Sequence, residues 1–115
     1  MDAWLKRVKH DLLKRVLWPA RDLRDAGVQD VKALKRGFRD LIDEEGAPIA
    51  ALPLWERLRA AAPPGTGAAC DAFQAALERA EQGLDQPWPA PLQAILALEP
   101  AFEELARAVE EQRET

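Results

Sequence analysis

Helix-forming residues dominate this chain, and residues that favour strands are scarce. The apolar part, 48% of 115 residues, is mostly alanine and leucine, with only five valines and three isoleucines. Alanine and leucine are strong helix formers, whereas strands are enriched in β-branched and aromatic residues. A chain of this length can bury enough surface to form one core. We therefore expect an all-α, single-domain protein over residues 1–115, built as a bundle of about five short helices.

Prolines and glycines divide the N-terminal part of the sequence into helical pieces. Asp2 is a candidate N-cap, and apolar residues then recur on one helix face as far as about Trp18. Pro19 can open a short second piece or kink the first. Gly27 suits a left-handed C-cap, with Val28 as its hydrophobic contact. The apolar face comprises Trp4, Leu5, Val8, Leu12 and Val16.

The clearest helical pattern begins after Asp30, which can act as an N-cap. Gly46 and Pro48 end this pattern, because both residues stop helices. A further helical stretch is expected over residues 49–62, with Pro53 in its first turn. The apolar residues of the helix after Asp30 follow at helical spacing and are Val31, Leu34, Phe38, Leu41 and Ile42.

The C-terminal half contains two more helical stretches. A loop over residues 63–67 precedes the first, and Thr66 is the hydroxyl residue placed to cap it. Gly83 ends that helix. In the last stretch Pro100 removes the hydrogen bond to the Leu96 carbonyl, which predicts a kink or a restart. The chain is expected to fray from about residue 111.

Few side chains in this sequence can support catalysis or metal binding. The chain has no serine, asparagine or tyrosine, and it has one cysteine and one histidine. Nucleophilic catalysis needs a nucleophile beside a base, and most metal sites need several His or Cys ligands. We expect His10 on the polar face of the first helix and Cys70 in the core. Glu99 and Glu103 share a helix face but make a poor cation site, so we predict no enzymatic activity, no cofactor and no metal.

The sequence shows no sign of membrane insertion or export. No segment approaches the ~18 consecutive apolar residues of a membrane span, and the first residues lack the apolar region of a signal peptide. One cysteine cannot form an intramolecular disulfide. Together with alanine, arginine and proline usage typical of a high-GC genome, these features predict a cytoplasmic protein of bacterial type.

The charges are distributed unevenly along the chain. Residues 1–45 carry 11 Lys/Arg against 9 Asp/Glu, whereas residues 46–115 carry 5 against 11. The first helix combines a wide apolar surface, two tryptophans and a basic face, and Trp and Arg often anchor interfaces. We therefore predict a small accessory or adaptor protein that binds another protein or a second copy of itself. The expected contact residues are Trp4, Lys6, Arg7, Leu13, Lys14, Leu17 and Trp18, and an exposed member such as Leu13 should tolerate glutamate.

Two other functions are also compatible with this sequence. A basic amphipathic helix with tryptophans can lie on a membrane surface. Residues 19–29 also resemble the first helix and turn of a helix-turn-helix, which would make the protein a small DNA-binding regulator. The negative net charge and nearby acidic residues oppose nucleic-acid binding. The basic stripe in the helix that follows is Lys32, Lys35, Arg36 and Arg39.

The first prediction concerns metal content. Protein purified without an affinity tag should contain no stoichiometric zinc or iron, because His10 and Cys70 are single residues of their kinds and lie far apart in sequence. Elemental analysis by mass spectrometry measures this. One metal ion per chain would contradict the prediction.

Overall fold

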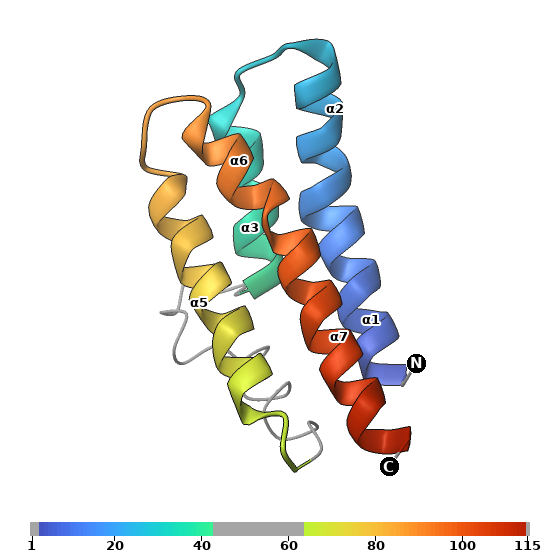
Figure 1. Ribbon diagram of the computed structural model, residues 1–115. Coiled ribbons are helices and arrows are strands. Elements are labelled where there is room, and N and C mark those ends of the chain that lie inside the picture. The colour runs from blue at the N-terminus through green and yellow to red at the C-terminus, as the bar shows by residue number, and fades with distance from the viewer. Residues whose placement is uncertain (1–2, 43–63, 115) are drawn as a thin grey trace.

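Residues 3–42 and 64–114 are described in the computed structural model, and over these ranges the chain is an all-α bundle (Figure 1). Four helices make up the described part, where the sequence predicts about five short ones for the whole chain. The helix expected over residues 49–62 lies outside the described residues. Helix one consists of α1 (Ala3–Leu12), the π-helical turn η1 (Leu13–Leu17) and α2 (Trp18–Ala26). The next two helices are α3 (Val31–Ile42) and α5 (Gly67–Gly83). The C-terminal helix consists of α6 (Ala90–Leu96) and α7 (Leu98–Glu114).

Helix one continues through Pro19 instead of breaking there. Proline has no N–H, so in an α-helix the carbonyl of Arg15 would lose its partner four residues later. The chain adopts a π turn at this point, and the Trp18 N–H donates to the carbonyl of Leu13, five residues earlier. Of the two alternatives that the sequence leaves open at Pro19, a separate second piece is not formed, and the residues after Pro19 continue the first helix.

Helix one and α3 meet backbone to backbone at η1. A Cβ atom at Gly37 would overlap the carbonyl oxygen of Arg15, so glycine is required at this position of α3. The Arg15 guanidinium also donates a hydrogen bond to the carbonyl oxygen of Asp40. Asp40 lies in the last turn of α3, where carbonyl groups lack partners within the helix. Arg15 thus contacts α3 through both its backbone and its side chain.

The connection between α2 and α3 confirms both caps expected there. Gly27 has φ 68°, in the left-handed region, and the Val28 N–H donates to the Leu23 carbonyl at 3.0 Å. These are the conformation and hydrogen bond of a Schellman motif. Val28 nevertheless remains 47% exposed. At the start of α3 the Asp30 carboxylate accepts a hydrogen bond from the Ala33 N–H at 3.1 Å.

The C-terminal half agrees with the sequence in part. The chain restarts before Pro100 as expected, because α6 ends at Leu96 and α7 begins at Leu98. Thr66 occupies the N-cap position of α5 but makes no capping hydrogen bond through its side chain, so its expected role is wrong. α7 stays helical to Glu114, beyond the point at which we expect fraying.

One core lies between the helices. The rings of Phe73 in α5 and Phe102 in α7 meet edge to face, with centroids 5.9 Å apart and an interplanar angle of 72°. Cys70 is 1% exposed, which confirms its expected place in the core. The largest side chains that are fully buried, besides Phe73, are Leu5, Leu12, Val16, Leu17, Leu34, Leu77, Ile95, Leu98 and Leu105.

The second prediction tests the contact at Gly37. Gly37→Ala should destabilise the protein by about 1–3 kcal/mol, the usual cost of forcing an extra methyl group into a packed site, although alanine is the better helix former. Gly67→Ala is the control, because Gly67 is also helical and nothing lies within 4 Å of its added Cβ. Denaturant unfolding followed by circular dichroism measures both, and equal stabilities would contradict the close contact.

Candidate protein interaction surface

The π turn decides which side chains of helix one face outward. At a uniform rotation of about 100° per residue, Leu17 lies outside the apolar arc of this helix. The additional residue in η1 rotates the positions that follow it by about 100°. Leu17 is consequently 1% exposed and belongs to the core, whereas Trp18 is 49% exposed. The assignment of Leu17 to the contact surface is therefore wrong, and Trp18 remains on that surface.

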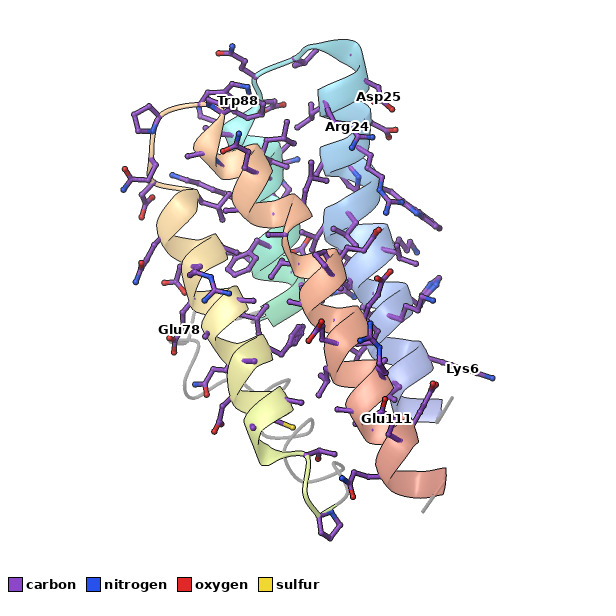
Figure 2. The ribbon with its side chains drawn as sticks, in the orientation of Figure 1. Lys6, Arg24, Asp25, Glu78, Trp88 and Glu111 are labelled. Atoms are coloured by element: carbon purple, nitrogen blue, oxygen red, sulfur yellow. The ribbon has the colours of Figure 1, made fainter. Side chains whose placement is uncertain are left out.

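The other expected contact residues divide in the same way. Lys6 and Lys14 are exposed, and Figure 2 shows Lys6 directed away from the bundle. Leu13 is partly buried and packs against the core, so it is less exposed than the sequence suggested. The side chains of Trp4 and Arg7 lie outside the described set.

Trp18 lies on the exposed side of helix one, and it is flanked by basic residues. Lys14 is one turn before it, and Arg21 follows at i+3 on the same face. The Arg21 guanidinium forms an ion pair with the carboxylate of Glu99 in the first turn of α7. Trp18 is therefore one turn away from a residue that reaches the first turn of α7. Among the described residues, Trp18 and Val28 are the large apolar side chains that are exposed.

A groove separates α1 from α7, and we call it the α1–α7 groove. Its floor is apolar, because Phe102 and Ala106 are 3% and 7% exposed. Its rim carries charges of both signs, with Lys9 on α1 and glutamates on α7. The sequence alone does not pair these two helices, since residues 13–97 lie between them. The groove has a volume of about 310 Å³ and is lined by Lys9, Phe102, Glu103, Ala106, Arg107 and Glu110.

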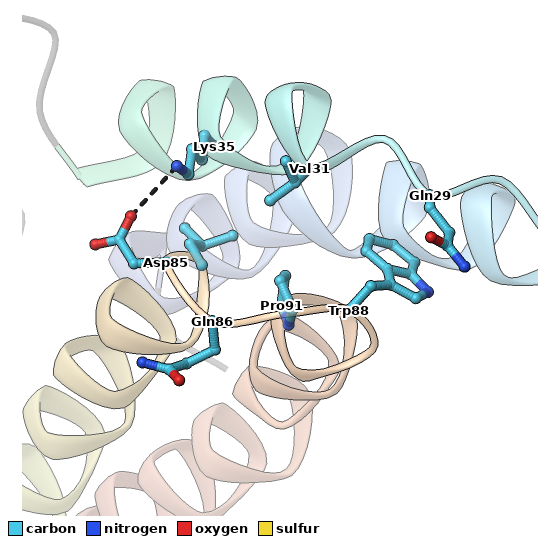
Figure 3. Close-up of a pocket in the computed structure, with 8 residues that line it drawn as sticks. Gln29, Val31, Lys35, Asp85, Gln86, Trp88 and Pro91 are labelled. Atoms are coloured by element: carbon cyan, nitrogen blue, oxygen red, sulfur yellow. Dashed lines mark ion pairs between the residues drawn. The ribbon is translucent and has the colours of Figure 1, made fainter.

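A second hollow of about 300 Å³ lies where the connector between α5 and α6 meets α3 (Figure 3). The indole of Trp88 and the side chains of Val31 and Pro91 line it. Lys35 Nζ lies 3.2 Å from Asp85 Oδ1, and the two groups are 44% and 74% exposed. An exposed pair of this kind contributes about 0–1 kcal/mol. It links α3 to the connector and occupies one lysine of the basic stripe.

The arrangement of α2 and α3 does not favour the DNA-binding alternative. α3 runs back along helix one, and its Gly37 lies against Arg15 (Figure 1). This is an antiparallel helical hairpin, whereas the two helices of a helix-turn-helix cross steeply. Lys32, Arg36 and Arg39 are exposed on α3, so the basic stripe lies at the surface. The helix that carries it does not cross the preceding helix steeply, as a recognition helix does.

Candidate chemical groups are separated or already engaged. His10 is exposed on helix one, Cys70 is buried, and Glu99 pairs with Arg21. Within residues 3–42 and 64–114, no three His, Cys, Asp or Glu side chains are grouped in a way that could hold a metal ion. None of the helices in these ranges is long and apolar enough to cross a membrane.

Comparisons with known proteins leave the function to be argued from the surface. No family model matches the sequence, and no curated protein or solved structure is significantly similar to it. Among the described residues, the exposed side chains of helix one and the adjoining α1–α7 groove are the surface features that bear on function.

The third prediction tests the register that the π turn imposes. Leu17→Ala should destabilise the protein by about 2–5 kcal/mol, the range for truncating a buried leucine. Trp18→Ala should change stability by less than about 1 kcal/mol, because the indole is half exposed. Denaturant unfolding of both variants gives the comparison. A larger loss for Trp18→Ala than for Leu17→Ala would show that the register is wrong.

Proposed function

We propose that this protein is a small non-catalytic adaptor that binds another protein through helix one, with Trp18 as the anchor. The 49% exposure of Trp18 carries the proposal. Covering the rest of this indole would remove about 100 Å² of apolar surface from water, which stabilises a complex by about 2–3 kcal/mol. Interface energy commonly concentrates in tryptophan and arginine side chains of this kind.

The charge of helix one indicates the chemistry of the partner. Residues 3–26 contain seven lysines and arginines against three aspartates. Lys6, Lys9 and Lys14 are exposed along this helix. A surface with this excess of positive charge attracts an acidic surface and increases the rate of encounter. The proposed partner therefore presents acidic side chains around an apolar patch.

The rigidity of the anchor also supports a binding role. Trp18 directly follows η1, which is held by the contact between Gly37 and Arg15. A side chain already placed on a fixed helix loses less conformational freedom on binding than one on a loose segment. The packing that stabilises the bundle thus positions the anchor.

A protein partner is favoured over a membrane surface by the burial of the apolar face. A helix that lies on a membrane inserts its apolar face among the lipids. In helix one that face is occupied by the core, because Leu5, Leu12 and Leu17 are at most 2% exposed.

The fourth prediction tests helix one as the contact surface. Replacing Lys14 with the photo-crosslinking residue benzoylphenylalanine should give a discrete adduct in cells that express the protein, because Lys14 is one turn from Trp18. Adding Trp18→Ala should reduce the adduct by more than about tenfold, because each 1.4 kcal/mol of lost anchor energy is about tenfold in affinity and the indole contributes about 2–3 kcal/mol. Gel electrophoresis and mass spectrometry measure the adduct and its mass.

Glu78 provides the matched control for this experiment. It is exposed on α5, on a different side of the bundle from Lys6 (Figure 2). The same crosslinker at position 78 should give no adduct that depends on Trp18. An adduct from position 78 but none from position 14 would contradict the proposed function.

A further inference from the structure

We infer that the acidic surface recognised by helix one is α7 of a second copy of this chain, in a dimer with two-fold symmetry. This inference rests on the proposed function, because it names the partner of the same helix. It follows from the opposite charges of two helices that share one face of the bundle.

Helix one and α7 form this face together. Figure 1 shows them side by side and running in opposite directions, with the N- and C-termini at the same end. Lys9 of α1 and Phe102 of α7 line the α1–α7 groove. At the other end of the face, Arg21 pairs with Glu99. The two helices therefore approach each other at the groove and at the first turn of α7.

The two helices carry opposite net charge. Helix one has seven basic residues against three acidic ones, whereas α7 has six glutamates against two arginines. The exposed members include Lys9 and Lys14 on helix one and Glu103 and Glu104 on α7. One face of the molecule thus has a basic half and an acidic half.

Such a face is complementary to itself about one particular axis. A two-fold axis that lies in the face, parallel to both helices and along the groove, places helix one of each copy over α7 of the other. The basic half then meets the acidic half twice, as an isologous interface requires. An axis in the same plane but perpendicular to the helices would place like charges together. Since each chain has net charge -4, only an arrangement that pairs unlike halves offsets the repulsion between copies.

The same axis covers the exposed indole. Because the axis is parallel to the helices, each residue faces residues of the second copy at its own level. Arg21 and its partner Glu99 place Trp18 near the level of the first turns of α7. Pro100 is exposed there. Trp18 of one copy would therefore lie against the start of α7 in the other, with an apolar proline available for contact.

Charge reversal tests this dimer. Lys9→Glu with Lys14→Glu makes the basic half acidic, and Glu103→Lys with Glu104→Lys makes the acidic half basic. Each double variant alone should weaken self-association by at least about tenfold, because like charges then face each other. An equimolar mixture of the two double variants should form a heterodimer. In that heterodimer helix one of each variant faces an α7 of opposite charge in the other variant. Sedimentation velocity and native mass spectrometry at low ionic strength measure this, where surface charges are least screened.

Matched controls separate the interface from the net charge. Lys32→Glu with Arg36→Glu on α3, and Glu78→Lys with Glu81→Lys on α5, change the net charge by the same amounts at exposed positions elsewhere. These variants should dimerise like the wild type. Circular dichroism verifies that each variant is folded.

A measurement on the wild-type chain keeps the test independent of any variant. Carbodiimide joins neighbouring lysines and glutamates, so a mixture of ¹⁴N- and ¹⁵N-labelled protein should give mixed-isotope crosslinks between Lys14 of one copy and Glu103 or Glu104 of the other. A wild-type protein that stays monomeric, a dimer that the reversals at positions 9, 14, 103 and 104 do not affect, or a mixture without heterodimer would each overturn the inference.

The two proposals fail in different ways. An adduct from position 14 with twice the 12.8 kDa mass of the chain supports the dimer. An adduct of another mass that depends on Trp18 preserves the proposed function and overturns the dimer. The absence of any adduct from position 14 overturns both.

Discussion

The contact between Gly37 and the carbonyl of Arg15 is the constraint on which the rest of this structure depends. It brings the backbones of helix one and α3 together at the π turn that precedes Pro19. Proline at this position removes a backbone donor, and the π turn accommodates the change without ending the helix. A side chain on residue 37 would separate the two helices, because the Arg15 carbonyl occupies the space that a Cβ atom would need.

This local arrangement determines the surface that the molecule presents. By rotating the second half of helix one, the π turn places Leu17 in the core and leaves Trp18 half exposed. The same helix approaches α7 at the α1–α7 groove and through the Arg21–Glu99 pair, so a basic helix with an exposed indole lies near an acidic one. Packing in the core and recognition at the surface therefore depend on the same turn. A change at Gly37 would alter the position of Trp18 as well as the stability of the bundle.

The sequence predicts part of this surface and misplaces another part. Lys6, Lys14 and Trp18 are exposed as expected. Charged side chains such as the two lysines seldom enter a core. Trp18 lies outside the apolar arc of helix one both with a uniform rotation per residue and with the π turn. Leu17 is misplaced because its expected position assumes a uniform rotation per residue. Lys9 and the glutamates of α7 form one groove only after the chain has folded, and no local pattern connects segments so far apart.

The sequence by itself determined the features that depend on neighbouring residues. The all-α class follows from helix propensity and from the spacing of apolar residues. The cap at Asp30 is a hydrogen bond to the N–H of Ala33, three residues further along the chain. The end of α2 follows from the backbone freedom of Gly27. Tertiary structure alone decided whether Pro19 breaks the helix, because the π turn packs against Gly37 from another helix. It also decided which charged helices share a face. These outcomes depend on contacts between residues distant in sequence, whose energies do not appear in any local pattern.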